Sequence, residues 1–351
     1  MTDSPAPENA APTEPRDRGD LREGAPEPEE KRPLWRQKTV IAAAIGLAVA
    51  LVLTVIGVLG RQGDDGQSGS GQSGPVAAIQ QIDVAGRPGA TPTLTVKGEL
   101  HTSGIKARTI SDGAGREIVQ GSPVLLAVTA FDSKGVLQSK TGYPDIHSAH
   151  ATAEELGTSL AGIVIGKKEG SRLVFLRNIS GSTDDSSVEV DVVDILPTLA
   201  SGSEVEPAEA GPLSVSMGEG GPVIKHGDDA APSNLVTQVI MRGDGQQVAA
   251  TDRIIAQYTA VRWDDGVVQA NSWDTGMPQV IDMNTTMPGI KRALADRTVG
   301  SRVAVTIPSD QATGDGVLCV VVDILAIDHQ GSGDVDGDGS GGETGDAQSG
   351  Q

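Results

Sequence analysis

Aromatic residues are scarce in this chain of 351 residues, where they make up only 2% of the sequence. Any binding pocket must therefore be built mainly from aliphatic side chains. Cysteine is scarcer still, because Cys319 is the only one. A single cysteine excludes an intramolecular disulfide and a cysteine-based zinc site. Cys319 stands in the apolar run VLCVVVDIL, which predicts a small buried side chain rather than a reactive thiol.

Positive charge is also in short supply. Lys and Arg total 27 against 47 Asp and Glu, which gives a formal net charge of −20. This balance argues against a nucleic-acid partner, since neutralising phosphates requires a basic face. The acidity is better suited to keeping the surface soluble. The sequence also contains no G-x-S-x-G, H-E-x-x-H or P-loop motif, so it carries no nucleotide or metal signature.

One long uncharged run is present, at residues 39–59 (TVIAAAIGLAVALVLTVIGVL). A helix of this length crosses a bilayer core of about 30 Å. Four cations precede the run: Lys31, Arg32, Arg36 and Lys38. The positive-inside rule then predicts a single-pass protein of the cell membrane, with its N-terminus in the cytoplasm and the rest outside. A cleaved signal peptide is the alternative, but the run is long for one and the GRQG that follows is a poor cleavage site.

Three segments have low-complexity composition. Residues 1–38 are rich in Pro, Glu, Asp and Arg and predict a disordered cytoplasmic segment, while residues 60–75 predict a flexible linker. Residues 330–351 predict a disordered acidic tail. Within the tail, DVDGDG opens like a calcium-binding loop, but the position that needs a bidentate Glu is Gly345. We therefore expect a solvated tail rather than a calcium site.

The middle of the chain repeats itself with an offset of about 130 residues. GREIVQGSPVLLAVTAFDSKGVLQ at 115–138 matches GQQVAATDRIIAQYTAVRWDDGVVQ at 245–269. EGSR at 169–172 matches VGSR at 299–302, and VVDIL occurs at both 192–196 and 321–325. TPTLTV at 91–96 also matches GPLSV at 211–215. The pattern predicts two homologous domains, 76–199 and 205–329, joined by SGSEVEPAEAG at 201–211.

Each repeat has the same expected secondary structure. Period-2 apolar alternation predicts strands at 235–241, 253–261, 301–307 and 317–325. Residues 288–296 begin with Pro and place Ile290, Ala293 and Leu294 on one face, which predicts a short amphipathic helix. In the first repeat, the corresponding helix is expected at 154–164. The predicted fold class is α+β, an antiparallel sheet curled over one short helix in each repeat.

The second repeat, in the order AQYTAVRWDDGVVQANSWDTGMP, PGIKRALADRTVGSRVAVTIPSD and VLCVVVDIL, resembles the FKBP-type peptidyl-prolyl cis-trans isomerases. The resemblance implies the same curled sheet, proline-containing polypeptides as partners, and rotation about X-Pro bonds. It implies no cofactor, no metal and no covalent catalytic residue. Rotation needs only a pocket that holds the twisted bond more tightly than the planar one and removes water from it.

The resemblance also implies a substrate-binding pocket. Its positions fall on Tyr258, Gln269, Gln279, Met287, Ile290, Thr313 and Val320. The N–H of Met287, at the start of the helix, is expected to receive a ligand carbonyl. Of the aromatic ring positions only Tyr258 keeps its ring, and the carboxylate position is Ala270. The first repeat has Val128, Gln138-Ser139 and Leu160 at the corresponding places, so we expect it to be a structural repeat.

Several residues have a plainer interpretation. Tyr258 also fits a sheet tyrosine of the core, Trp273 a half-buried loop ring, and Asp274 a carboxylate that caps its loop. His147 and His150 with Asp145 form a weak metal candidate, and loop histidines are the simpler expectation.

Three functions remain open at this point. The first is a membrane-anchored, extracytoplasmic isomerase that acts on exported polypeptides. The second is a non-catalytic module that holds extended polypeptides in the same groove, because Gln269 and Gln279 would admit water there. The third is an inert spacer.

Overall fold

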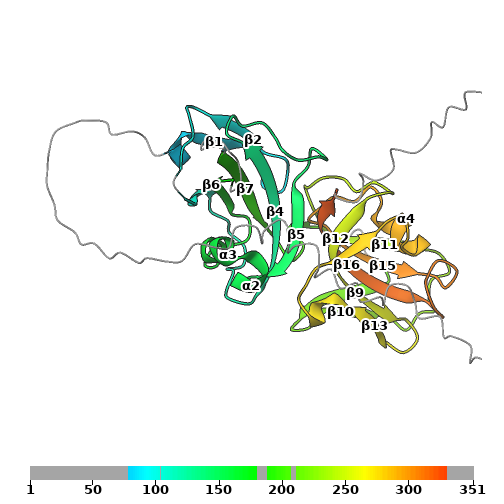
Figure 1. Cartoon of the computed structure of the whole chain (residues 1–351). Helices are drawn as coiled ribbons and strands as arrows, with labels where there is room; N and C mark the ends of the chain where they lie inside the picture. The colour runs from blue at the N-terminus through cyan, green and yellow to red at the C-terminus, as the bar shows by residue number, and fades with distance from the viewer. Residues whose placement is uncertain (1–77, 103, 180–187, 207–210, 330–351) are drawn as a thin grey trace, which may run out of the picture. The chain divides into compact units, whose positions relative to one another are not determined.

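The computed structural model describes residues 78–102, 104–179, 188–206 and 211–329, which are mostly strand with a few short helices (Figure 1). Within this part of the chain, no helix is long and apolar enough to span a membrane. The predicted membrane span 39–59, the segments 1–38 and 60–75, and the acidic tail 330–351 lie outside the described residues.

Two larger antiparallel sheets carry most of the described residues. The five-stranded sheet has the order β3-β6-β7-β4-β5, formed by Lys106–Ser111, Arg172–Asn178, Val188–Leu196, Pro123–Asp132 and Asp145–His150. The seven-stranded sheet has the order β13-β12-β16-β15-β11-β8, formed by Val268–Asn271, Arg253–Arg262, Leu318–Asp328, Arg302–Ile307, Val236–Arg242 and Ser203–Glu204. β14 (Gln279–Asp282) also pairs with β12.

The two sheets share a strand order. The five strands β11-β15-β16-β12-β14 have the same order, in terms of their sequence in the chain, as β3-β6-β7-β4-β5. The predicted strands at 235–241, 253–261, 301–307 and 317–325 correspond to β11, β12, β15 and β16. The strand predictions are confirmed because alternation on an antiparallel strand places every second side chain on the buried face.

The predicted helix at 288–296 is α4, which spans Pro288–Leu294. Pro288 occupies the first turn, where its missing N–H costs no hydrogen bond. Ile290, Ala293 and Leu294 are buried as their spacing predicts. They pack with even-numbered residues of β12 and β16, such as Ile254 and Val322, to form the core on one face of the sheet.

The opposite face of each sheet is covered by a two-stranded hairpin, which the sequence did not predict. β9 (Leu213–Gly218) pairs with β10 (Gly221–His226), and their apolar residues pack with Trp263, Cys319 and Val321. In the first half, β1 (Ile82–Ala85) and β2 (Thr93–Val96) pack against β6 and β7 in the same way, after the 3-10 turn η3 (Ala78–Gln81). The predicted match between 91–96 and 211–215 is wrong, because these segments are β2, the second strand of its hairpin, and β9, the first strand of the other hairpin.

The helix expected at 154–164 is in fact two helices, α2 (Ala153–Leu156) and α3 (Thr158–Val164). Gly157 separates them with a φ of 76°, a left-handed backbone conformation that ends the first helix. Thr152 caps α2 by accepting a hydrogen bond from the Glu155 N–H.

The expectation that His147 and His150 are loop residues is wrong, because both lie on β5. Residues three apart on a strand point to opposite faces, so the two imidazoles do not converge on one ion. Burial lowers the pKa of His147, although the nearby Asp145 carboxylate works in the other direction. The described residues contain no group of three His, Cys, Asp or Glu side chains arranged to hold a metal ion.

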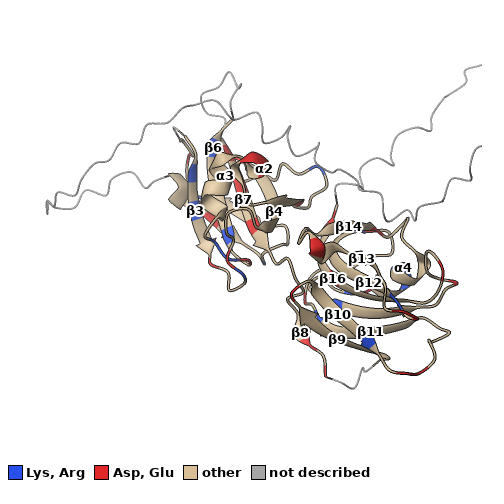
Figure 2. Ribbon diagram, turned by 90° about the horizontal axis from the view of Figure 1, so that it is seen from below, with Lys and Arg blue, Asp and Glu red and all other residues tan. Residues whose placement is uncertain are grey.

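The repeated letters GSR and VVDIL form a buried ion pair in each sheet. Arg302 binds Asp323 through two hydrogen bonds, Nε to Oδ1 at 2.6 Å and Nη2 to Oδ2 at 2.7 Å. Arg172 binds Asp194 with the same atoms at the same distances. The pair of Arg302 and Asp323 stands out because most positions of β12, β15 and β16 are uncharged. Figure 2 shows β12 and β16 mostly in tan, the colour of uncharged residues. Asp323 also accepts the N–H of Ala200 at 2.8 Å.

The serine of the same motif fixes a turn on the neighbouring segment. The Gly113 N–H donates to Ser171 Oγ, and the Gly243 N–H donates to Ser301 Oγ, both at 2.9 Å. The letters that recur between the two halves are therefore residues that hold the sheet together.

Candidate functional site

The candidate site lies where four elements meet on the α4 face of the seven-stranded sheet. Tyr258 comes from β12, Ala270 from β13, Ile290 from α4 and Val320 from β16, and all four pack with the same core. Ile290 and Val320 are buried, whereas Tyr258 and Met287 are only partly buried. The site therefore has an aliphatic floor, with a tyrosine ring and a methionine above it.

Tyr258 is held at both its ends. Its hydroxyl donates to Gln279 Oε1 at 3.2 Å, because pairing of Ala256 with Gln279 places that amide on the neighbouring strand β14. Its backbone N–H donates to Ser272 Oγ at 2.8 Å. Burial raises the pKa of the Tyr258 phenol, so the ring is neutral at physiological pH. A neutral, fixed ring is suited to packing against an apolar group.

The loop after β13 is a short 3-10 turn, η5 (Ser272–Asp274), that is fastened to β12. Ser272 Oγ also hydrogen-bonds Gln257 Oε1, and Gln257 Nε2 donates to the Gly276 carbonyl at 2.8 Å. Asp274 accepts Asn271 Nδ2 at 2.6 Å, which is the loop-capping role that the sequence suggested. The loop is therefore a rigid wall beside Tyr258.

Trp273 is a half-buried ring in this loop, and it packs against the backbone of Gly221 in the β9–β10 turn. Its indole Nε1 is buried and has no hydrogen-bond partner among the described residues. Asn271 Nδ2 also donates to the Gly220 carbonyl at 3.1 Å. Trp273 thus faces the hairpin rather than the core cluster of Tyr258.

The start of α4 supplies a backbone donor. The N–H of Met287 makes no hydrogen bond within the described part of the chain. Pro288 has no N–H, and the next N–H along the chain, on Gly289, donates to the Gln311 carbonyl at 3.0 Å. Gly289 has no room for a side chain, because a Cβ there would lie 2.3 Å from Ile307 Cγ2. The close approach of α4 to β15 at this glycine fixes the position of the Met287 amide.

Two of the predicted site residues lie apart from this cluster. Gln269 Nε2 donates to the Val267 carbonyl at 3.2 Å, so its amide is occupied by its own turn. Thr313 lies in the segment before β16, where Ala312, rather than Thr313, packs against the core. The sequence reasoning also missed Ile281, whose place two residues after Gln279 on β14 was the available signal.

The chemistry available at the site is limited to packing and hydrogen bonding. Its members include one hydroxyl, one amide side chain and one free backbone N–H, and no carboxylate stands among Tyr258, Gln279, Met287, Ile290 and Val320. Chemically, such an arrangement can exclude water from an apolar group and offer one hydrogen-bond donor to a carbonyl oxygen.

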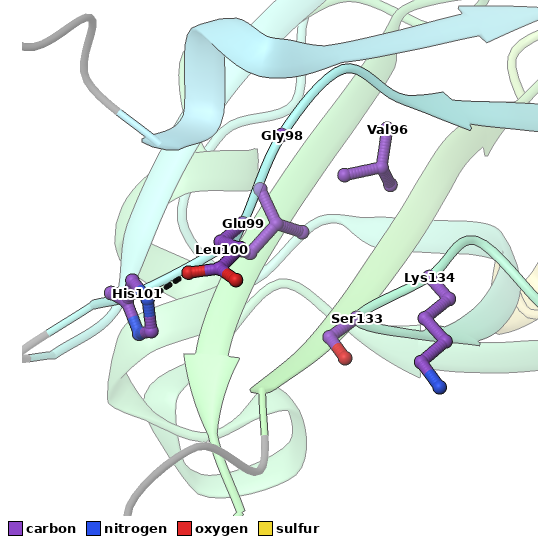
Figure 3. A pocket seen from close by; sticks show the side chains of 7 residues that line it. All are labelled: Val96, Gly98, Glu99, Leu100, His101, Ser133 and Lys134. Carbon is purple, nitrogen blue, oxygen red and sulfur yellow. Dashed lines mark hydrogen bonds and ion pairs between the residues drawn. The ribbon is translucent and has the colours of Figure 1, made fainter.

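A separate surface hollow of about 460 Å³ lies in the first half of the described chain (Figure 3). It is lined by Val96, Gly98, Glu99, Leu100, His101, Ser133 and Lys134. His101 Nε2 lies 3.4 Å from Glu99 Oε2, and both side chains are largely exposed. None of the predicted site residues contributes to this hollow.

No protein-family model matches the chain, and no curated protein matches it. Several solved structures are similar to parts of it. FkpA from Escherichia coli is 22% identical over 32% of this chain and 51% of its own, with a TM-score of 0.26. A peptidyl-prolyl cis-trans isomerase from Pseudomonas syringae pv. tomato is 24% identical over 27% of this chain and 75% of its own, with a TM-score of 0.25.

The three FKBP domains of wheat FKBP73 are 15% identical over 64% of this chain and 94% of their own, with a TM-score of 0.24. The chain spans about half the length of FkpA. TM-scores this low do not place the chain in a family. The functional argument therefore depends on the residues of the site.

Proposed function

We propose that the seven-stranded sheet and α4 form an FKBP-type site that binds proline-containing segments and accelerates rotation about their X-Pro bonds. The observation that carries the proposal is the convergence of Tyr258, Ile290 and Val320 beside the unpaired N–H of Met287. In this proposal the pyrrolidine ring packs on the aliphatic floor, and the Met287 N–H receives a ligand carbonyl.

The proposed mechanism needs no charged group. Removing water from the imide favours the twisted bond, which has less charge separation than the planar amide. A hydrogen bond that is stronger in the twisted form than in the planar form adds to the rate. Gln279 holds Tyr258 in place by accepting its hydroxyl proton, so the ring keeps its position without a carboxylate partner.

The second candidate function is non-catalytic binding of extended polypeptides. It is favoured by the loss of the carboxylate position to Ala270 and by the reduction of the pocket's aromatic residues to Tyr258. In this case the site would bind the same segments and leave the isomerisation rate unchanged.

The wider setting is also part of the proposal. The uncharged run 39–59 anchors the chain in the cell membrane and places the sheets outside it, where exported polypeptides are the partners. The two sheets arose from one duplicated domain. The duplication is supported by the shared strand order and by the matching ion pairs.

The test is an isomerisation assay of the full-length chain, in detergent, on short peptides with one X-Pro bond. We expect acceleration over the spontaneous rate and a fall in kcat/KM of about tenfold to a hundredfold in Tyr258→Ala, since burying such a ring is worth about 1.5–3 kcal/mol. Tyr143→Ala is the matched control, because it removes the other tyrosine from an exposed loop and should keep full activity.

Peptide binding without acceleration would replace the first function by the second. Neither binding nor acceleration would exclude both. A peptide that binds equally well to the chain and to Tyr258→Ala would show that the ligand lies elsewhere.

A further inference from the structure

His226, at the open end of the β9–β10 hairpin, has an arrangement that a neutral imidazole does not satisfy. Its Nδ1 lies 2.6 Å from the Gly227 carbonyl oxygen and its Nε2 lies 2.9 Å from the Trp263 carbonyl oxygen. A carbonyl oxygen accepts hydrogen bonds and cannot donate them. A neutral imidazole has one N–H, so one of its nitrogens would face an oxygen lone pair with a lone pair of its own.

The ring of His226 also stacks on the indole of Trp263, with centroids 4.0 Å apart and planes 17° from parallel. A cation over an indole face is attracted by the negative charge of that face. The stack therefore favours the same imidazolium that the two carbonyl oxygens favour.

The segments that pack around His226 carry more carboxylates than cations. The hairpin and the loop after it carry Lys225, Asp228 and Asp229. The end of β12 and its turn carry Arg262, Asp264 and Asp265, and the segment before β16 carries Asp315. Five carboxylates thus stand against two cations, and one of the cations, Arg262, is already paired with Asp265 at 3.2 Å.

We propose that His226 is a proton-operated clasp, which fastens the β9–β10 hairpin to the end of β12 when its imidazole is charged. The hairpin covers the outer face of the sheet through Leu213, Val215 and Ile224, which pack with Trp263. When the imidazole loses its proton, one of its two hydrogen bonds to the carbonyl oxygens is lost. The ring that stacks on Trp263 is then also no longer a cation. Imidazoles in general change charge between about pH 5 and 8, so this is the range in which to test the clasp.

The β9–β10 hairpin also contacts the sheet and its η5 turn at the end opposite His226. The opposite end of the hairpin is the turn in which Gly220 accepts Asn271 Nδ2 and Gly221 packs on Trp273. This inference rests on the geometry of His226 alone and is independent of whether the site at Tyr258 is catalytic.

The experiment is amide hydrogen exchange of the full-length chain between pH 5 and 8, corrected for the intrinsic pH dependence of exchange. We expect protection of the β9 and β10 amides to fall by about threefold to tenfold as His226 loses its proton, which corresponds to one hydrogen bond. His226→Gln should show the lower protection at every pH. His101→Gln, which removes an exposed histidine from the first half, should behave like the unmodified chain.

The proposal would be overturned if protection of the β9 and β10 amides stayed constant from pH 5 to 8 in the unmodified chain. It would also be overturned if the pH dependence of this protection persisted in His226→Gln. A second measurement avoids the variants altogether. In ¹⁵N spectra of labelled histidine, both ring nitrogens of His226 should carry slowly exchanging protons at the acidic end. If either ring proton of His226 exchanged rapidly at acidic pH while the β9 and β10 amides stayed protected, the proposal would also be overturned.

Discussion

The buried pair of Arg302 and Asp323 gives the sharpest test of how the seven-stranded sheet is held together. Asp323 is 0% exposed, and its carboxylate accepts two hydrogen bonds from Arg302 and one from the Ala200 N–H. The perturbation is Arg302→Leu, which keeps much of the aliphatic volume and removes the cation. Asp323 would then be a buried carboxylate with a single backbone donor.

The magnitude follows from that uncompensated charge. Removing one partner of a buried ion pair costs about 3–5 kcal/mol, whereas replacing both partners by apolar residues is often close to neutral. We therefore expect Arg302→Leu to be strongly destabilising, and Arg302→Leu combined with Asp323→Leu to recover most of the loss. The exposed pair of Arg262 and Asp265 is the matched control, with side chains 37% and 45% exposed. Arg262→Leu should cost about 1 kcal/mol or less.

Urea unfolding followed by tryptophan fluorescence measures these differences, because Trp263 packs against β15 and β16 and Trp273 lies in the η5 turn beside β12. With a slope of about 2 kcal/mol per molar urea, a loss of about 4 kcal/mol lowers the midpoint by about 2 M. An Arg302→Leu midpoint within about 0.5 M of the unmodified chain would refute the reasoning. So would a double variant that is less stable than the single one.

Two further predictions follow from close packing and burial. Gly289→Ala should lower the free energy of unfolding by about 1–3 kcal/mol in the same urea assay, because the new methyl group would collide with Ile307. Gly162→Ala on α3 is the control, because a methyl group there meets open space and should leave the stability unchanged or raise it. Equal effects of the two substitutions would contradict this prediction. Burial raises the pKa of the Cys319 thiol from 9.0 to about 11, so folded protein should resist alkylation at pH 8 until urea is added. The free energy of unfolding should also fall as the pH rises from 9 toward 11, because the Cys319 thiol ionises in this range in the unfolded chain but not in the folded one. Fast alkylation of Cys319 in the folded chain would show that the thiol is not buried.

The strands and α4 were predictable because burial leaves a periodic mark on the sequence. Ile254, Ala256 and Tyr258 alternate along β12 and reach the same core. The outer hairpin carries the same mark in Leu213, Val215 and Met217 of β9, but a run of six residues was too short to be identified as a strand from alternation alone. The division of the helix in the first half depended on the left-handed conformation of one residue, Gly157.

The sequence predicted that Tyr258, Ile290 and Val320 lie together, but it did not predict the contacts of the polar residues around them. The resemblance identified Gln269 and Gln279 as equivalent polar wall residues, and the structure separates them. Gln269 satisfies its amide within its own turn, whereas Gln279 accepts the Tyr258 hydroxyl. That difference depends on the pairing of β12 with β14, which composition and spacing do not reveal.

The registers of the two sheets show which half has a tyrosine at the position of Tyr258. Tyr258 pairs with Val322 on β16, and Val128 pairs with Val193 on β7, each one residue before the aspartate of the buried ion pair. Val128 therefore occupies the place of Tyr258, as the sequence match predicted, and it offers neither a ring nor a hydroxyl. The residues that recur between the halves bind arginine to aspartate inside each sheet, where removing one partner alone would leave a buried charge. Their agreement consequently says nothing about a binding site, and the proposed site is best tested at a position where the halves differ, such as Tyr258.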